Sequence, residues 1–217
     1  VRMAQDGMLY FSVGERGRMK EAQDPQNHLG TVIRLQENGK VPQDNPFLKN
    51  RKGRAEIFSY GHRNPQGMAI HPKSGKIWVH EHGPQGGDEI NILKAGANYG
   101  WPKTTFGEQY GGGKIGIGPK SPGIEEPLLH WTPSIAPSGM DFYQGDIFPN
   151  WNGDLLVGSL KFRMLVRVDL EGSLVQGQEV VFQDQIGRIR DVRVSPEGKV
   201  YLLNDEYRGG IFRLDPL

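Results

Sequence analysis

The sequence predicts an all-β fold built from repeated antiparallel blades, as in a β-propeller. A turn that ends in glycine and leads into an alternating strand recurs four times, with glycines at 7, 75, 153 and 198. The chain of 217 residues also contains 31 Gly and 15 Pro, which indicates many turns. No segment carries a helical apolar stripe with capping residues. The repeats favour a propeller over the alternative of a β-sandwich with irregular loops, because radial repetition protects sheet edges.

Each repeat supplies strands in which side chains alternate between apolar and polar. The strands after the glycine turns are expected at 8–13, 77–80, 155–157 and 200–203. Second strands are expected at 31–35, 89–93, 165–169 and 210–215, and all but the one at 89–93 carry a central Arg. Alternating stretches at 67–72 and 191–196 come ahead of two glycine turns. Long insertions at 14–30, 39–56 and 98–127 are expected to be loops.

The chain length accommodates about four such blades. The first repeat begins almost at Val1, so we expect residues 1–217 to form a single partial propeller domain whose first blades are absent. Loss of blades leaves sheet edges open. This favours association with the missing part or oligomerisation through the exposed edges.

Composition excludes several classes of partner and site. The 26 Lys and Arg nearly balance the 25 Asp and Glu, without basic blocks, which argues against nucleic acid as a partner. No apolar run approaches the roughly 20 residues of a membrane span. The absence of Cys excludes disulfides and thiolate sites.

The segment 59–68 is the most distinctive candidate site. Arg63 offers a fork of hydrogen-bond donors and Asn64 an amide, and Pro65 forces the residue before it into an extended conformation. This combination suits a planar, oxygen-rich ligand. A turn in which Arg63 pairs with a carboxylate is an equally good interpretation of the residues alone.

A second group of cations lies near the end of the chain. Arg188 and Arg190 are two residues apart and would share one face of a strand, which a polyanion such as a tricarboxylate would favour. A solvated strand face paired to a nearby Asp is the more ordinary explanation of this spacing. Lys161 ends an apolar strand in a different repeat and is a candidate for the same anion.

The polar loop at 81–91 combines carboxylates, free carbonyls and glycines, a mixture that hard cations such as Ca²⁺ prefer. His80 and His82 alone are a weak indication of zinc, because no third ligand is placed beside them. Glu15 ends its repeat strand at the position equivalent to Glu81, Lys161 and Asp205, as expected at the mouth of a propeller channel. The loop at 131–139, rich in Pro and Ser, is a further candidate wall.

Together these segments closely resemble the glucose/sorbosone dehydrogenase family, in particular the bacterial PQQ-dependent aldose sugar dehydrogenases. The matching motifs appear in family order over nearly the whole chain, at 60–67, 81–84, 87–91, 98–102, 133–138, 159–161 and 188–192. The resemblance implies a six-bladed β-propeller with the cofactor pyrroloquinoline quinone (PQQ) over its central channel. It also implies a periplasmic, secreted bacterial protein.

The resemblance assigns site residues to the cofactor and to Ca²⁺. It implies that Arg63 and Asn64 contact the quinone oxygens, with Arg63 also acting in catalysis by polarising the quinone. It implies that the PQQ carboxylates are bound by Lys161, Arg188 and Arg190. Carbonyl oxygens of Gly83 and Pro84 would ligate the Ca²⁺ that holds PQQ, and Ser134 would stand at the edge of the cofactor. Glu89 and the carbonyl of Tyr99 match a second, structural Ca²⁺ site.

The implied activity is oxidation of an aldose sugar at C1 to a lactone, with hydride transfer to PQQ and an external electron acceptor. Glu15 matches an active-site acid near the catalytic base. In the family that base is a His ahead of the strand that begins here, and none of the six His of this chain matches its motif. We therefore expect the isolated chain to be inactive. Two alternatives are a Ca²⁺-dependent propeller lactonase and a non-catalytic binding module.

Overall fold

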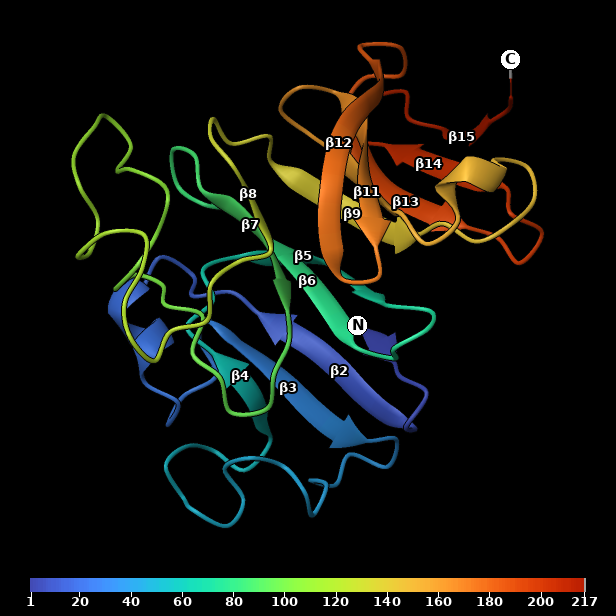
Figure 1. Ribbon diagram of the computed structural model, residues 1–217. Helices are drawn as coiled ribbons and strands as arrows, with labels where there is room; N and C mark the ends of the chain where they lie inside the picture. Colours follow the sequence, from blue (N-terminus) through green and yellow to red (C-terminus); the bar gives the residue numbers. More distant parts are fainter. Residues whose placement is uncertain (217) are drawn as a thin grey trace. The chain divides into compact units, whose positions relative to one another are not determined.

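The computed structural model describes residues 1–216, which form strands, two short 3-10 helices and loops (Figure 1). No α-helix occurs in this described part of the chain. The strands pair into four antiparallel sheets that follow one another along the sequence. This confirms the predicted all-β class with about four blades.

The first two sheets occupy most of the first 131 residues. The first consists of β1 (Arg2–Met3), β2 (Met8–Val13), β3 (Thr31–Gln36) and β4 (Ile57–Tyr60), in that order. The second consists of β5 (Pro65–Ile70), β6 (Ile77–Glu81), β7 (Asp88–Ile92) and β8 (Leu129–Trp131), also in that order. A short helix, η1 (Met19–Gln23), lies in the insertion between β2 and β3.

The last two sheets contain the remaining strands. One consists of β9 (Pro137–Phe142), β10 (Leu155–Ser159), β11 (Met164–Glu171) and β12 (Leu174–Gln183). The other has three strands, β13 (Ile189–Val194), β14 (Val200–Asn204) and β15 (Ile211–Leu214). The helix η2 (Pro149–Trp151) precedes β10. Every glycine turn of the repeat leads into the second strand of its sheet, as the sequence predicts.

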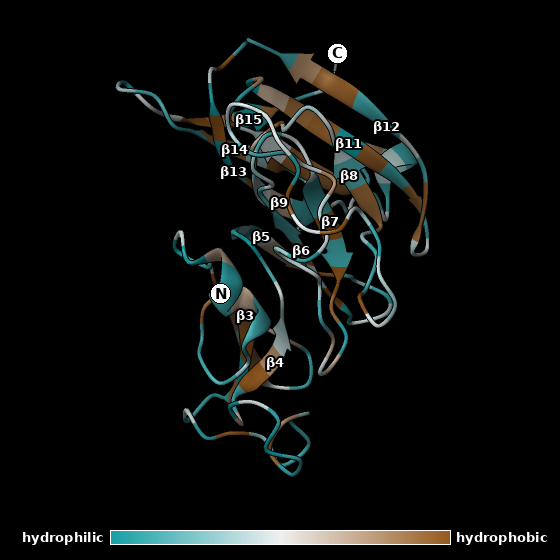
Figure 2. Ribbon diagram, turned by 90° about the vertical axis from the view of Figure 1, so that its left-hand side faces the viewer, coloured by the Kyte–Doolittle hydropathy of each residue, from teal (hydrophilic) through white to brown (hydrophobic). Residues whose placement is uncertain are grey.

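The chain forms two compact units, each with its own apolar core. The first comprises 1–66 and 75–134, and the second comprises 67–74 and 135–217. Ile33, Phe47 and Ile57 form a cluster in the first unit. The core of the second unit consists of Tyr143, Leu156, Leu165, Ile189, Val192, Val200 and Leu202. Hydrophobic residues accordingly concentrate on strands and hydrophilic ones on loops (Figure 2).

The recurring Arg of the second strands is a structural residue. Arg34 bonds to Asp6, beside the first glycine turn, at 3.2 Å and lies over the ring of Tyr10 at 5.9 Å. Arg167 bonds to Asp154, beside the third glycine turn, at 3.0 Å and is likewise placed over an aromatic ring. Arg34 and Arg167 therefore each tie a middle strand to the turn that starts the strand before it, whereas Arg213, on the edge strand β15, pairs with Asp215 at 2.7 Å.

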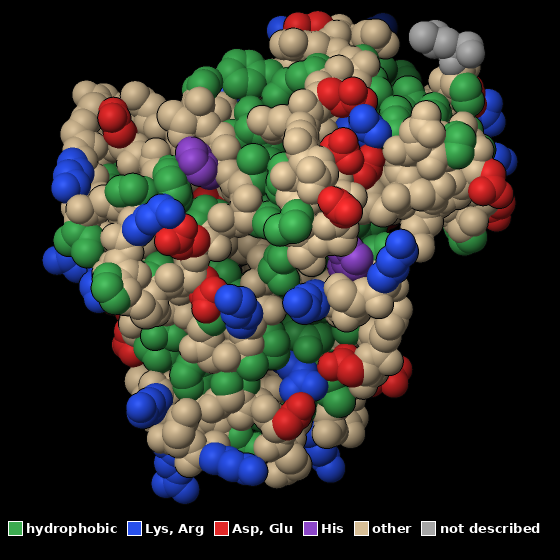
Figure 3. All heavy atoms as spheres, viewed as in Figure 1, with side chains coloured by type: hydrophobic (Ala, Val, Ile, Leu, Met, Phe, Trp, Pro, Cys, Tyr) green, Lys and Arg blue, Asp and Glu red, His purple; other side chains and the backbone are tan. Residues whose placement is uncertain are grey.

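Several strands were not predicted. The loop expected at 131–139 is shorter, because β8 extends to Trp131 and β9 begins at Pro137. Strand β12 is mostly exposed and therefore lacks the apolar alternation by which the other strands were recognised. The insertions at 39–56 and 98–127 are free of named strands, as expected. Positive and negative side chains are interspersed on the face that Figure 3 shows, in keeping with the balanced composition.

Candidate functional site

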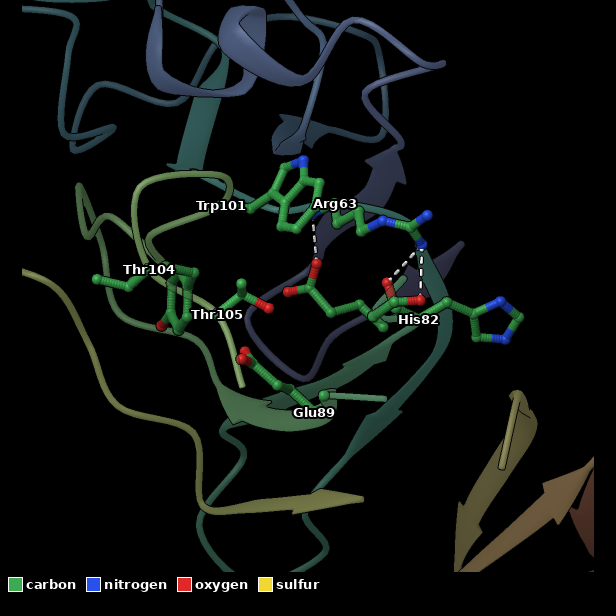
Figure 4. A pocket seen from close by; sticks show the side chains of 10 residues that line it. Arg63, His82, Glu89, Trp101, Thr104 and Thr105 are labelled. Carbon is green, nitrogen blue, oxygen red and sulfur yellow. Dashed lines mark hydrogen bonds between the residues drawn. The ribbon is translucent and has the colours of Figure 1, made fainter. Parts of the chain in front are cut away.

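Arg63 lies in the loop between β4 and β5 and is held at both its main chain and its guanidinium group. Its N–H donates to the carboxylate of Glu81, and its carbonyl accepts from the N–H of Glu15 at 2.8 Å. One guanidinium nitrogen donates to the carbonyls of His82, at 3.0 Å, and Gly83, at 2.9 Å. Figure 4 shows the bonds of Arg63 to Glu81, His82 and Gly83, and the His82 imidazole pointing away from the pocket. The Arg63 side chain is thus fixed before any ligand binds.

The loop at 82–87, which follows β6, presents its carbonyls because the backbone is tightly folded on itself. A Cβ on Gly83 would overlap the carbonyl oxygen of Gly86, so only glycine is accommodated there. The N–H of Gly83 donates to Asp88 at 2.9 Å, and the hydroxyl of Ser134 donates to the same carboxylate at 2.8 Å. Asp88 therefore joins two of the predicted site residues.

A cavity of about 350 Å³ opens beside Arg63 within the first unit. Its lining combines apolar and polar groups: Glu15, Gly17, Met19, Arg63, Pro84, Trp101, Gln109, Tyr110 and Ile115. The guanidinium of Arg63 is 5.3 Å from the centre of the Trp101 ring. Glu15 is only 6% exposed, and its Oε2 has no hydrogen-bond partner among residues 1–216. A buried acceptor without a partner is costly, so this carboxylate is suited to receive a hydroxyl group of a ligand.

A smaller pocket lies between the ends of β6 and β7. Glu81 and Glu89 are direct cross-strand partners, and both line it. Burial, and to a lesser extent the charge of Glu81, raises the pKa of Glu89 to about 8. A cation would relieve this repulsion between carboxylates. Within residues 1–216 no group of three or more His, Cys, Asp and Glu could hold a metal, so backbone carbonyls would have to complete the ligand set.

Tyr99 and Asn64 occupy the same unit as Arg63. Tyr99 lines the small pocket, and its hydroxyl donates to the carbonyl of Ile92 at 2.8 Å. The group of Tyr99 that is predicted to ligate Ca²⁺ is its main-chain carbonyl. The carbonyl of Asn64 accepts from the N–H of His82 at 3.1 Å. Arg63, Asn64 and the 82–87 loop are thereby linked through main-chain bonds.

The predicted cations of the second unit are arranged differently. Arg188 and Arg190 both bond to Oδ2 of Asp205, at 3.2 and 2.5 Å. Their side chains are 48% and 42% exposed. The ion-paired group of Arg188, Arg190 and Asp205 carries one more positive than negative charge, and the nearby Glu206 carboxylate accepts the main-chain N–H of Arg188 at 2.9 Å. Lys161 is exposed, and its ammonium lies 5.2 Å from the centre of the Phe162 ring.

The structure also gives roles to three residues that the sequence placed in candidate segments without assigning them a function. Glu81 and Asp88 each accept two or more hydrogen bonds within the loop cluster, and Trp101 packs on the Arg63 guanidinium. The signals in the sequence were the position of Glu81 at a strand end, equivalent to Glu15, and the carboxylates of the polar 81–91 loop. Hydrogen bonds between segments far apart in the chain leave no local pattern.

The fold and these sites define an all-β protein of repeated propeller blades in which Arg63 is fixed beside a cavity. Residues 1–213 match the family described as Glucose / Sorbosone dehydrogenase. The chain belongs to this family.

Relatives and solved structures agree with this assignment. The chain is 44% identical over 212 residues to aldose sugar dehydrogenase YliI of Escherichia coli (strain K12), covering 97% of this chain and 57% of that protein. It matches a crystal structure of glucose dehydrogenase with a TM-score of 0.96 and 44% identity, over 99% of this chain and 63% of the other. It also matches the PQQ-bound form of aldose sugar dehydrogenase from Streptomyces coelicolor, with a TM-score of 0.78 and 27% identity, over 98% and 60% of the two chains.

These matches confirm the predicted propeller class. They also show that the chain spans about three-fifths of the length of the proteins it matches. Among residues 1–216 there is no helix with the length and apolar character needed to cross a membrane.

Proposed function

We propose that the protein oxidises aldose sugars at C1 to lactones with PQQ as cofactor and Ca²⁺ as an aid. The observation that carries this proposal is the Arg63 guanidinium, fixed against the carbonyls of the 82–87 loop beside a cavity with a buried carboxylate. The names of the relatives and the PQQ-bound neighbour support it. We further propose that residues 1–217 are part of one propeller domain.

Arg63 and Asn64 would contact the quinone oxygens. Within residues 1–216 the guanidinium donates hydrogen bonds only through Nη1, so its Nη2 retains donors for such a contact. A donor fixed in advance stabilises charge that develops on an oxygen without reorganising. When bound, PQQ supplies the acceptor for the hydride of the sugar.

The carbonyls of Gly83 and Pro84 would hold the Ca²⁺ next to the cofactor, with Ser134 at the cofactor's edge. The Gly83 carbonyl already accepts from Arg63, but a carbonyl oxygen has a second lone pair for a cation. Glu89 and the Tyr99 carbonyl would hold the second Ca²⁺. The crowding of carboxylates beside Glu89 is consistent with a cation at that position.

Lys161, Arg188 and Arg190 would bind the carboxylates of PQQ. Arg188 and Arg190 share a single carboxylate, so their excess of positive charge is available to an anion. Arg side chains are suited to this role because the guanidinium fork matches a carboxylate.

Glu15 would accept a hydrogen bond from a sugar hydroxyl in the cavity and act as the active-site acid. An external electron acceptor would regenerate the cofactor. We also propose a periplasmic location, which follows from the family resemblance, and oligomerisation through exposed sheet edges, which follows from the unpaired backbone groups that such edges present.

The test is reconstitution of the full-length gene product with PQQ and Ca²⁺, followed by a sugar-dependent dye-reduction assay. We expect reduction that requires both additions and is abolished by a Ca²⁺ chelator added before PQQ. Hydrolysis of lactones with Ca²⁺ and no PQQ would instead identify a lactonase. Sugar binding without either reaction would identify a non-catalytic module.

A further inference from the structure

Three buried polar side chains form a continuous chain behind Arg63. Ser59 and His62 are fully buried and Glu81 is 4% exposed. The hydroxyl of Ser59 lies 3.0 Å from Nε2 of His62, and Nδ1 of His62 lies 2.9 Å from Oε1 of Glu81. The His62 ring also stacks on Tyr99, with ring centres 4.5 Å apart. Both nitrogens of the ring are therefore used, and the ring cannot turn.

Glu81 is the end of this chain that meets Arg63. Its Oε2 accepts the N–H of Arg63, a bond drawn in Figure 4, while its Oε1 faces His62. An ionised carboxylate only accepts hydrogen bonds, so His62 donates through Nδ1–H and its Nε2 accepts from the hydroxyl of Ser59. Each residue in this series of hydrogen bonds therefore donates toward Glu81: Ser59 to His62, and His62 to Glu81.

Glu81 acts on Arg63 at two points. Its side chain holds the main chain of Arg63. Its own main chain continues directly into His82 and Gly83, whose carbonyls accept from the Arg63 guanidinium. A shift of Glu81 would therefore displace both the main chain and the guanidinium group of Arg63.

The same three residue types form the triads of hydrolases, but here the geometry excludes that role. A nucleophilic serine must reach a substrate, whereas Ser59 is fully buried. The serine end of the chain therefore gives no access to a substrate.

We propose that Glu81, supported by His62 and Ser59, is a positioning residue that sets where the Arg63 guanidinium lies. The identity of the ligand that Arg63 meets, PQQ, rests on the proposed function. The positioning itself rests only on the contacts of these residues.

The experiment compares Glu81→Gln with Asp154→Asn in the full-length gene product. Asp154 is the control, because it is 3% exposed and, like Glu81, accepts both a main-chain N–H and a side-chain donor, from Leu170 and Arg167, each at 3.0 Å; Glu81 accepts in addition from Nδ2 of Asn91 at 3.4 Å. The Glu81→Gln change would present an amide NH₂ to groups that are themselves donors. Two quantities are measured: hydrogen exchange of the Arg63 and Glu15 amides by NMR, and the dissociation constant of PQQ in Ca²⁺.

We expect Glu81→Gln to speed exchange at both amides and to weaken PQQ binding at least about tenfold, since a buried acceptor is lost. Asp154→Asn should leave both measurements within about twofold of the parent, although it destabilises the fold. If Glu81→Gln does not fold, Ser59→Ala breaks the chain at its outer end and should still speed exchange at Arg63 selectively.

Unchanged exchange at Arg63 in Glu81→Gln, or equal losses in Asp154→Asn, would overturn the positioning role. Faster exchange confined to Glu81→Gln supports that role even if the parent does not bind PQQ. Absence of PQQ binding by the parent would instead contradict the proposed function.

Discussion

The two groups of cations proposed to bind PQQ are built in opposite ways. Arg63 is held by a buried carboxylate, two backbone carbonyls and an aromatic ring. Arg188 and Arg190 are more than two-fifths exposed and share only Asp205. The contacts of Arg63 fix the direction in which its guanidinium donates hydrogen bonds. Arg188 and Arg190 supply positive charge on side chains that can still change conformation.

This difference suggests that Arg63 and the Arg188/Arg190 pair have different roles toward the cofactor. Stabilising charge on a reacting oxygen requires a donor that is already oriented. Attracting carboxylates requires mainly an excess of positive charge, which solvent and salt screen when it is exposed. We therefore expect substitutions in the two groups to differ in size and in salt dependence.

The largest effect is expected for Arg63→Ala. Loss of the oriented guanidinium should lower kcat/KM for sugar by roughly 10³-fold, as for other preorganised donors. Arg63→Lys should recover little, because an ammonium lacks the fork of donors. Arg54→Ala is the control, since within residues 1–216 the Arg54 side chain donates only to the carbonyl of Gln26 on the surface, and its loss should leave the dye-reduction rate unchanged.

Gly83→Ala should be the next most damaging change. The added Cβ would overlap backbone atoms of Gly86 and Gly87, which cannot move cheaply, so we expect a loss of roughly 1–3 kcal/mol of unfolding free energy. Gly177→Ala is the control, because no heavy atom lies within 4 Å of its added Cβ. Urea unfolding of both variants measures the difference. Equal unfolding free energies for the two variants would contradict the claim that the 82–87 loop has no room for a Cβ at position 83.

Arg190→Ala should weaken PQQ binding about tenfold through the loss of one charge-assisted hydrogen bond. Because this cation is exposed, the effect should shrink when NaCl is raised from about 0.05 to 0.5 M. Binding titrations at both salt concentrations test this. A loss that is independent of salt would place Arg190 in the same category as Arg63.

The smallest effect is expected for Asp205→Asn. Removal of the shared carboxylate leaves two uncompensated guanidinium groups, so PQQ should bind a few-fold more tightly at low salt, as expected for exposed charges. Arg190 and Arg188 hold the pKa of Asp205 below its usual value. The pairing is therefore present above the ordinary pKa of Asp and lost only as pH falls through the lowered one. The gain should be the same at pH 6 and pH 8, and weaker binding would contradict it.

The sequence predicted the repeated strands, such as β2 and β10, because each is a short, mainly apolar run that directly follows a glycine turn. It did not predict β12, whose exposed residues form no such run. Among site residues, Arg63 and the glycines of the 82–87 loop were apparent from their unusual local chemistry. Glu81 and Asp88 were not recognised as partners, because their roles depend on bonds to residues distant in sequence.

The most direct test of the proposed function is the affinity of the full-length gene product for PQQ in the presence of Ca²⁺. Arg188→Ala/Arg190→Ala should weaken binding at least about 100-fold, since two charge-assisted bonds are lost. Arg213→Ala is the matched control, because Arg213 is also half-exposed and paired with an Asp, at 2.7 Å. Parent-like binding by the double variant, or an equal loss in Arg213→Ala, would contradict the assignment of these cations to the cofactor.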